Sequence, residues 1–246
     1  MKHKKLIVFD KDGTLIDIHY YWGSMIEMRS LLLSDRFATL PEKVSISTSL
    51  MNAMGVDVST GLLKPEGPVG IKPREFIVSV VKEVLAEANL AATRDDVEEV
   101  FALVDEYSRA NLASFINVLP GVKSLLAKLK SQNCWVTVAT TDLNERAWLG
   151  LNVANIGHFI DSIVGGDQVN EVKPAPDMLI KLMHEYGVSC DETLMIGDAI
   201  VDQEMAYAAG VDFFGVKTGL VDKAVISSNK SCWNEDMSEI EKKLCG

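Results

Sequence analysis

Cysteines are few in this sequence, and their spacing builds no recognisable site. The four of them lie far apart and form no CxxC pair: Cys134, Cys190, Cys232 and Cys245. This spacing argues against a disulfide framework and against a metal held by sulfur, so we expect reduced thiols.

A long apolar run near the start is also missing, because only Leu6 to Phe9 separate MKHKK from Asp10. That run is too short for a signal peptide or a membrane span, so we expect a cytoplasmic protein without a membrane partner.

Basic residues are scarce relative to acidic ones. Lys and Arg number 24 against 35 Asp and Glu, which gives a net charge of -11. This balance argues against nucleic acid as a partner and leaves small molecules as the expected ligands. Repeats and low-complexity tracts are absent, and 246 residues that are 48% hydrophobic suffice for one large or two smaller globular domains.

Strand-like and helix-like segments alternate over the second half of the chain. Strand-like runs occupy residues 6–9, 134–139, 162–165, 194–196 and 212–216, and helical stripes lie at about 122–129, 144–153 and 179–186, with a further helix ending at Gly210. This alternation predicts a parallel sheet with right-handed crossovers, the doubly wound α/β class. Because the first strand belongs with this sheet, we expect residues 1–17 and 118–246 to form the core domain. Residues 18–117 are then an inserted helical domain.

Two features stand out within the insertion. Thr93 followed by Asp96 is typical of a helix start, because the pair can form a capping box. The segment from Asp57 to Glu75 carries three Gly and three Pro and is expected to be an extended loop. Its cations Lys64, Lys72 and Arg74 are either solvated or reach a distal anionic group of a substrate. The aromatic residues at 20–22 either line a substrate pocket or pack.

Polar side chains gather where the expected strands end. Asp10 and Asp12 follow the first strand, Thr140 and Thr141 the second, and Asp198 the fourth, with Asp202 at the start of the next helix and Lys173 before another. Each residue alone has an ordinary structural explanation, such as a turn, a helix cap or a surface charge. Parallel sheets, however, bind ligands at the carboxyl ends of their strands. We therefore predict one site at this edge.

The charges at that edge indicate its chemistry. Two unit charges about 4 Å apart cost roughly 4 kcal/mol at an effective dielectric near 20, so several converging carboxylates need a cation. All-oxygen ligands with incomplete protein coordination suit Mg²⁺, which also accepts substrate phosphate as a ligand. Lys173 adds a fixed positive charge, and the hydroxyl of Thr140 can donate to a phosphoryl oxygen.

The two aspartates after the first strand take different roles in such a site. Asp10 is the candidate nucleophile, since its carboxylate can attack phosphorus and form an aspartyl phosphate. Asp12 is the candidate acid and base, which protonates the leaving alcohol and later takes a proton from water. Gly13 permits the tight turn that brings loop amides near the phosphate.

These residues resemble the motifs of the haloacid dehalogenase-like hydrolase superfamily. DKDGT at residues 10–14 is similar to its first motif, Thr140 to its second, Lys173 to its third and GDAIVD at residues 197–202 to its fourth. The resemblance implies a Rossmann-like core with an inserted cap of subclass C1. It also implies Mg²⁺ bound by Asp10, the backbone carbonyl of Asp12 and Asp198, with help from Asp202.

Details of the motifs narrow the expected activity. Dehalogenases and phosphonatases of the superfamily lack an acid at the position of Asp12, so its presence indicates a phosphate ester as substrate. Gly13, Thr14 and Thr141 are the expected substrate-binding residues. Phosphoglycolate phosphatase-like members often have Asn where Thr141 stands, which leaves the detail of substrate contact open.

The first functional expectation is a Mg²⁺-dependent phosphatase of a small phosphorylated metabolite, such as phosphoglycolate or a sugar phosphate. A phosphomutase of the β-phosphoglucomutase type uses the same motifs and is the alternative enzyme. A noncatalytic module that binds a phosphorylated ligand or scaffolds an assembly is the alternative from another class, although such a module has no need of both Asp10 and Asp12. The sequence predicts neither the substrate nor the oligomeric state.

Overall fold

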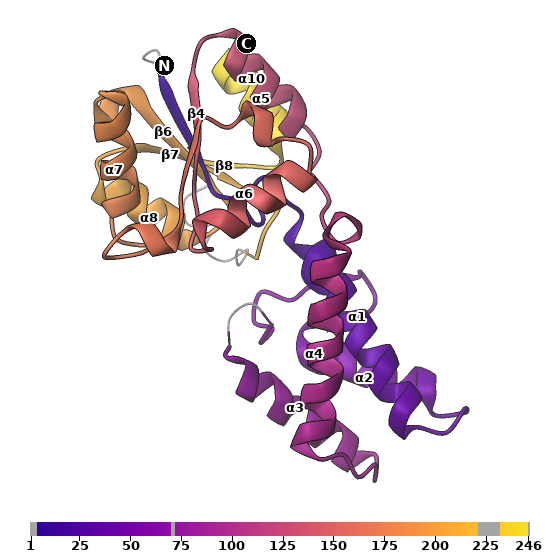
Figure 1. Ribbon diagram of the computed structural model, residues 1–246. Coiled ribbons are helices and arrows are strands. Elements are labelled where there is room, and N and C mark those ends of the chain that lie inside the picture. The colour runs from indigo at the N-terminus through magenta and orange to yellow at the C-terminus, as the bar shows by residue number, and fades with distance from the viewer. Residues whose placement is uncertain (1–3, 70–71, 221–231, 246) are drawn as a thin grey trace. The chain divides into compact units, whose positions relative to one another are not determined.

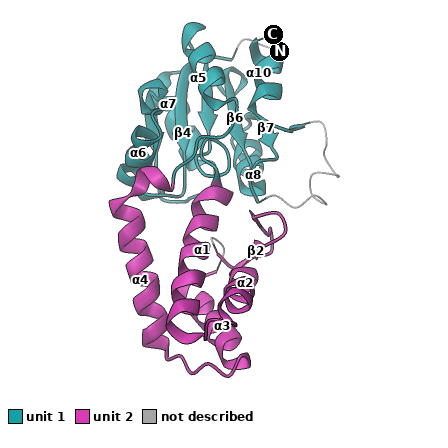
Figure 2. Ribbon diagram, turned by 90° about the vertical axis from the view of Figure 1, so that its right-hand side faces the viewer, with its two compact units in different colours: residues 1–17, 116–246 teal, residues 18–115 magenta. Residues whose placement is uncertain are grey.

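The computed structural model describes residues 4–69, 72–220 and 232–245. The chain forms two compact units: Met1–Asp17 with Ile116–Gly246 make unit 1, and Ile18–Phe115 make unit 2 (Figure 2). Within the described residues, no helix combines the length and the apolar character needed to cross a membrane.

Unit 1 is built on a six-stranded parallel sheet with the strand order β5-β4-β1-β6-β7-β8 (Figure 1). Its strands are β1 (Leu6–Phe9), β4 (Trp135–Ala139), β5 (Ser162–Val164), β6 (Thr193–Gly197), β7 (Asp212–Val216) and β8 (Trp233–Asn234). Helices α5 (Val122–Ser131), α6 (Asn144–Val153), α7 (Asp177–Tyr186) and α8 (Ile200–Ala208) lie between strands, and α10 (Met237–Cys245) follows β8. The expected α/β class with a parallel sheet is confirmed.

Helices cover both faces of this sheet because alternate strand residues point to opposite sides. Ile7 and Phe9 of β1 belong to a buried cluster with apolar side chains of α5, α6 and α10. Leu6 and Val8 belong to a second cluster with side chains of α7 and α8. Figure 1 shows the two groups of helices on opposite sides of the strands. Strands buried on both faces explain the continuous apolar runs in the sequence.

The chain enters and leaves unit 2 through two segments that pair with each other. Ile16 forms an isolated bridge with Val118, and the amide of Asp17 donates to the carbonyl of Asn117 at 2.8 Å. The two ends of the insertion are therefore adjacent in unit 1, so a whole helical unit is inserted without breaking the sheet.

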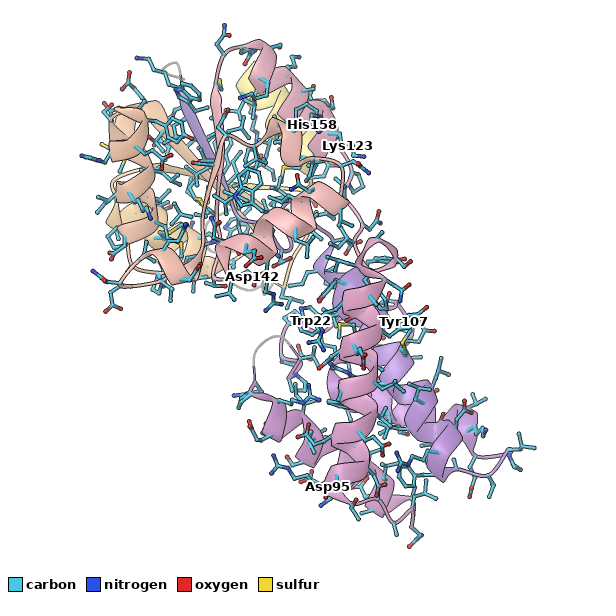
Figure 3. All side chains as sticks on the ribbon, viewed as in Figure 1. Trp22, Asp95, Tyr107, Lys123, Asp142 and His158 are labelled. Carbon is cyan, nitrogen blue, oxygen red and sulfur yellow. The ribbon has the colours of Figure 1, made fainter. Side chains whose placement is uncertain are left out.

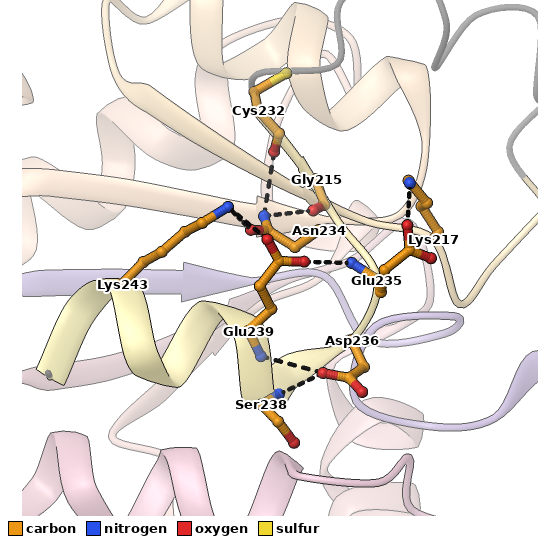
Figure 4. A network of polar contacts seen from close by, with 9 residues as sticks. All are labelled: Gly215, Lys217, Cys232, Asn234, Glu235, Asp236, Ser238, Glu239 and Lys243. Atoms are coloured by element: carbon orange, nitrogen blue, oxygen red, sulfur yellow. Dashed lines mark hydrogen bonds and ion pairs between the residues drawn. The ribbon is translucent and has the colours of Figure 1, made fainter.

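The last two elements of unit 1 were not expected from the sequence. Strand β8 has two residues, and a segment that short carries no periodic pattern. Polar contacts hold it in place: the side-chain amide of Asn234 donates to the carbonyl of Gly215 at 2.9 Å (Figure 4). Lys243 of α10 donates in turn to the Oδ1 atom of Asn234 at 2.5 Å. These contacts join β7, β8 and α10 into one edge of the core.

Unit 2 consists of packed helices and a small hairpin. Its elements are α1 (Ile18–Phe37), α2 (Lys43–Met54), β2 (Val56–Asp57), β3 (Leu62–Leu63), α3 (Arg74–Glu87) and α4 (Arg94–Ala110). Helix α1 contacts α2 and α4, and α3 contacts the same two helices. The expected capping box is confirmed, because the hydroxyl of Thr93 accepts from the amide of Asp96 while the Asp96 carboxylate accepts from the amide of Thr93.

The expectation of an extended loop over residues 57–75 is partly wrong, because β2 and β3 form a two-stranded antiparallel hairpin at its start. Arg74, expected to be either solvated or a substrate contact, instead pairs with Glu98 and Asp105 of α4. Lys64 donates to the side chain of Asn52 at 3.3 Å. The backbone amide of Lys72 donates to the carbonyl of Pro68.

Tyr21 and Trp22 pack against a cluster that includes Met25, Val104 and Phe115.

Candidate active site

Three neighbouring strands deliver polar residues to one edge of the sheet. Strands β4 and β6 flank β1, and Phe9 is aligned with Val138 on one side and Ile196 on the other. Asp10 comes directly after β1, Thr140 after β4 and Asp198 after β6, so parallel pairing in this register brings all three to the same edge. The structure thus gathers these residues as the sequence predicts.

Three carboxylates converge at this edge. Each of Asp10, Asp198 and Asp202 offers one oxygen, and these oxygens lie within 4.8 Å of one another. Asp198 and Asp202 are buried, with exposed fractions of 4% and 1%. Asp202 comes from the first turn of α8, and its carboxylate also accepts from the amide of Ala199 at 3.1 Å.

Lys173 supplies a positive charge between two of these acids. Its Nζ atom lies 2.5 Å from Oδ1 of Asp10 and 2.6 Å from Oδ1 of Asp202. Burial alone would lower the pKa of Lys173, but the two carboxylates outweigh it and raise that pKa. The lysine therefore stays charged and links the first, third and fourth motifs.

One lysine does not balance the three converging carboxylates. Burial raises the pKa of Asp10, with the charge of Asp202 acting in the same direction and Lys173 opposing both. The pKa of Asp198 is raised still further, by burial first and then by the charges of Asp10 and Asp202. Burial and the repulsion between the carboxylates thus both disfavour the fully ionised site, and a cation would offset both effects.

The residues present fit a divalent cation. Their donor atoms are carboxylate oxygens, which hard cations prefer, and the raised pKa values of Asp10 and Asp198 show that additional positive charge would be stabilising. The carboxylate of Asp12 is not a member of the converging group, so its expected contribution to a metal site is that of its backbone carbonyl. A role of Asp10, Asp198 and Asp202 as metal ligands remains a prediction.

Asp198 is held from several directions. The hydroxyl of Thr14 donates to its Oδ1 atom at 2.8 Å. Gly13 and Gly219 approach it so closely that a Cβ atom would lie 2.3 Å and 1.6 Å, respectively, from its Oδ2 atom. The φ angle of Gly13 is +86°, so the expected need for glycine in this turn is confirmed. Thr218 fixes the same turn, because its hydroxyl donates to the carbonyl of Gly13 at 2.6 Å.

The second-motif loop presents one buried and one exposed hydroxyl. Thr140 is 2% exposed, and its Oγ1 atom accepts from the amide of Asp142 at 3.2 Å. This geometry leaves the Thr140 hydroxyl hydrogen available for an acceptor in the site. Thr141 is exposed. Binding of substrate by Gly13, Thr14 and Thr141 stays a prediction, and Thr14 has a structural task as the donor to Asp198.

The remaining site acid, Asp12, is paired with its neighbour in sequence. The Nζ atom of Lys11 lies 2.9 Å from Oδ2 of Asp12 and 3.1 Å from Oδ2 of Asp142. Burial raises the pKa of Asp12 and Lys11 opposes this shift. Asp12 and Asp10 therefore have separate cationic partners.

Sequence reasoning missed four residues at this edge: Lys11, Asp142, Thr218 and Gly219. Thr218 and Gly219 follow β7 after Lys217, so the rule that ligands bind at the carboxyl ends of parallel strands could have found them. Lys11 and Asp142 stand equally close to the ends of β1 and β4, so the same rule could have placed them at this edge, but it does not show that they pair with each other.

Comparison with known proteins bears on this site. A family model described as haloacid dehalogenase-like hydrolase matches residues 66–216. A phosphoglycolate phosphatase from Pseudomonas putida is 26% identical over 223 residues, which cover 87% of this chain and 70% of that protein. The pyrophosphatase PpaX of Halalkalibacterium halodurans is 33% identical over 129 residues, 52% of this chain and 58% of that protein. The matched part thus spans little more than half the length of this second relative.

Solved structures share the fold. A Thermotoga maritima protein provisionally named a β-phosphoglucomutase superposes with a TM-score of 0.67 at 20% identity, covering 98% of this chain and 99% of that one. The family match takes in the second, third and fourth motifs and extends over more than half of the chain, and the relatives in sequence are phosphatases. The resemblance expected from the motifs is confirmed: the chain belongs to the haloacid dehalogenase-like hydrolase family and is similar to its phosphoglycolate phosphatases.

Proposed function

We propose that this protein is a Mg²⁺-dependent phosphatase that hydrolyses a small phosphorylated metabolite through an aspartyl phosphate on Asp10. The observation that carries the proposal is the convergence of the Asp10, Asp198 and Asp202 carboxylates within 4.8 Å, with Lys173 bridging two of them. Asp10, Asp198 and Asp202, with the backbone carbonyl of Asp12, would hold the Mg²⁺. When bound, the ion would neutralise the carboxylates and polarise the phosphoryl group.

The residues of the chain divide the reaction between them. A carboxylate oxygen of Asp10 forms a bond to phosphorus as the bond from phosphorus to the leaving oxygen breaks. Asp12 gives its proton to that leaving oxygen, so an alcohol departs. Water then attacks the aspartyl phosphate, Asp12 takes a proton from it, and inorganic phosphate leaves with the Asp10 carboxylate restored.

Two further residues act on the charge of the phosphoryl group. Lys173 holds Asp10 at 2.5 Å and adds a fixed positive charge beside the point of attack. The Thr140 hydroxyl already accepts from the backbone, so its own hydrogen can donate to a phosphoryl oxygen. Both groups favour a doubly negative phosphate ester over a neutral ligand.

The substrate is proposed to be of the phosphoglycolate or sugar phosphate type. The relatives support a phosphorylated substrate but differ in their own names, which include a phosphoglycolate phosphatase and a pyrophosphatase. We propose that the helical insertion, unit 2, acts as the cap that selects among such substrates. We also retain the prediction that the protein acts in the cytoplasm.

A screen of phosphorylated metabolites tests the proposal. Release of inorganic phosphate is measured with Mg²⁺ and again with a chelator, for the parent and for Asp10→Asn. We expect turnover that needs the metal and that falls by at least about a thousandfold in Asp10→Asn. Asp212→Asn is the matched control, because Asp212 begins β7, at the opposite end of the strands, and pairs with Lys4 there. An Asp10→Asn variant as active as the parent would reject the nucleophile assignment.

A phosphomutase is the second candidate, favoured by the structural similarity to the protein provisionally named a β-phosphoglucomutase. Both reactions begin with transfer to Asp10 and differ in whether water or a sugar hydroxyl receives the phosphoryl group. Product analysis separates them: an isomeric sugar phosphate without released inorganic phosphate would identify the mutase. A chain that turns over no phosphate ester would point to a noncatalytic binding module.

A further inference from the structure

Lys11 is a buried cation with two acidic partners on different loops. Only 8% of the residue is exposed. Its ammonium bridges Oδ2 of Asp12, on its own loop, and Oδ2 of Asp142. Asp142, labelled in Figure 3, lies on the connection between β4 and α6. Burying a lysine costs free energy unless its charge is matched, so the pair of acids stabilises it in this position.

Asp142 is the fixed end of this bridge. Its amide donates to Oγ1 of Thr140 at 3.2 Å, and its carbonyl accepts from the amide of Gly166 at 2.9 Å. Its Oδ1 atom accepts from the amide of Leu143, also at 2.9 Å. Backbone and side chain are thus both anchored, and the Oδ2 atom is left to hold Lys11.

Asp12 is the loosely held end. Its side chain is 41% exposed. Within the described part of the chain, the Asp12 carboxylate forms its ion pair with Lys11. Because Lys11 contacts Oδ2, Oδ1 is the oxygen that no described hydrogen bond or ion pair occupies, and the ammonium beside Oδ2 disfavours a proton there.

We propose that Lys11, anchored by Asp142, is a positioning residue for Asp12 that fixes Oδ2 and leaves Oδ1 to carry the transferred proton. The inference rests on the proposed function and deepens it. As the bond from phosphorus to the leaving oxygen breaks and the bond to Asp10 forms, the proton on Oδ1 passes to the leaving oxygen. Asp12 is left ionised, with Lys11 balancing its new charge, and Oδ1 later takes a proton from the attacking water.

The bridge also joins two motif loops. Asp12 connects through Lys11 to Asp142, and Asp142 connects through its amide to Thr140. Proton transfer by Asp12 and phosphoryl contact by Thr140 are thereby set in one geometry. Preorganisation of this kind matters because acid catalysis requires the donor within hydrogen-bond reach of the leaving oxygen.

The test uses the sensitivity of acid catalysis to the leaving group. An alkyl phosphate expels an alkoxide that needs the proton, whereas p-nitrophenyl phosphate expels a phenolate that does not. The ratio kcat/KM reports the steps through cleavage of that bond, so it is measured for both substrates in the parent, Lys11→Met and Asp142→Asn. We expect kcat/KM for the alkyl ester to fall by about ten- to a hundredfold, less than the roughly 10²–10⁴-fold of complete acid–base catalysis because Asp12 itself remains. We expect kcat/KM for the aryl ester to fall by less than about threefold.

Controls separate positioning from folding. Lys130→Met removes another lysine–aspartate pair of unit 1, with Asp161 at 2.7 Å, and is expected to change neither value. Lys11→Arg keeps the cation and is expected to recover part of the loss in Lys11→Met. Asp142→Asn keeps an acceptor for the Leu143 amide, so it preserves the loop while removing the charge that anchors Lys11.

The possible failures are distinguishable. If the parent turns over neither phosphate ester, the proposed function itself fails, and this inference with it. If the parent is active but the folded Lys11→Met and Asp142→Asn variants lose the same factor on both esters, or lose nothing on the alkyl ester, the positioning role is overturned while the phosphatase stands.

Discussion

Replacement of Lys173 by methionine perturbs the charge balance of the site most directly. Two carboxylate oxygens no more than 4.8 Å apart repel by at least about 3.5 kcal/mol at an effective dielectric near 20. The Lys173 ammonium, 2.5 Å from Asp10 and 2.6 Å from Asp202, attracts each of them by about 6 kcal/mol on the same scale. Without it, the buried acids of the metal-free protein have only repulsion between them.

Proton uptake limits the cost of that change. The pKa values of Asp10 and Asp198 are already raised, so these acids can become neutral and relieve part of the repulsion. We therefore expect Lys173→Met to lower the free energy of unfolding by about 3–5 kcal/mol, as for removal of one partner of a buried ion pair. For a chain of this size that corresponds to a fall in Tm of about 6–20 °C.

Thermal unfolding in the presence of a chelator measures the effect. Lys130→Met is the control, because the side chain of Lys130 is 33% exposed and its pair with Asp161 is expected to contribute less than about 1 kcal/mol. Adding Asp202→Asn to Lys173→Met removes one of the repelling charges and should restore part of the stability. A Tm loss in Lys173→Met no larger than in Lys130→Met would refute the view that Lys173 compensates the buried carboxylates.

Three further predictions concern the same cluster. The raised pKa values of Asp10 and Asp198 let the metal-free folded state bind more protons than the unfolded state. The contribution of these two groups to its stability therefore rises as the pH falls through their folded-state pKa values. Mg²⁺, in contrast, needs the ionised carboxylates. The gain in Tm on adding Mg²⁺ should therefore be larger near about pH 8 than near about pH 5, and a gain that grows on acidification would contradict the charge argument. Thr14→Val removes the donor to Asp198 and should weaken Mg²⁺ binding, followed by calorimetry, by about ten- to a hundredfold; an unchanged affinity would show that this hydrogen bond does not orient the carboxylate. Gly219→Ala places a Cβ atom on the Asp198 carboxylate and should lower phosphatase activity by at least about tenfold. Gly150→Ala is the control and should keep the activity of the parent, because its Cβ would meet Ile116 at an ordinary 3.6 Å. Equal activities of the two variants would mean that residue 219 can move away from Asp198 freely.

Much of unit 1 is predictable because its signals are local. Strands buried on both faces appear as apolar runs, and the helix over residues 144–153 has the bounds that the sequence indicates. Gly187, with a φ angle of +63°, ends α7 where the sequence places the end of that helix. The positions of Asp10, Thr140 and Asp198 follow from the parallel sheet, since each comes directly after a strand.

The features that sequence reasoning missed depend on contacts between distant segments. Strand β8 has two residues and pairs only because β7 offers an edge. The pairing of Arg74 with Asp105 requires α3 to lie beside α4, and the bridge from Lys11 to Asp142 requires two loops to meet. None of these contacts leaves a periodic or spacing signal in the chain. They emerge only when the tertiary structure is known.

The most direct test of the account is to trap the phosphoryl group on the enzyme. Protein turning over substrate with Mg²⁺ is quenched and reduced with borohydride, which converts an aspartyl phosphate to homoserine, and is then digested with trypsin. The tryptic peptide Leu6–Lys11 holds Asp10 as its only carboxylate side chain, so mass spectrometry can assign the product without ambiguity. The account predicts homoserine at position 10 only when substrate and Mg²⁺ are both present. Active enzyme that yields no homoserine there, or yields it at another aspartate, would contradict it.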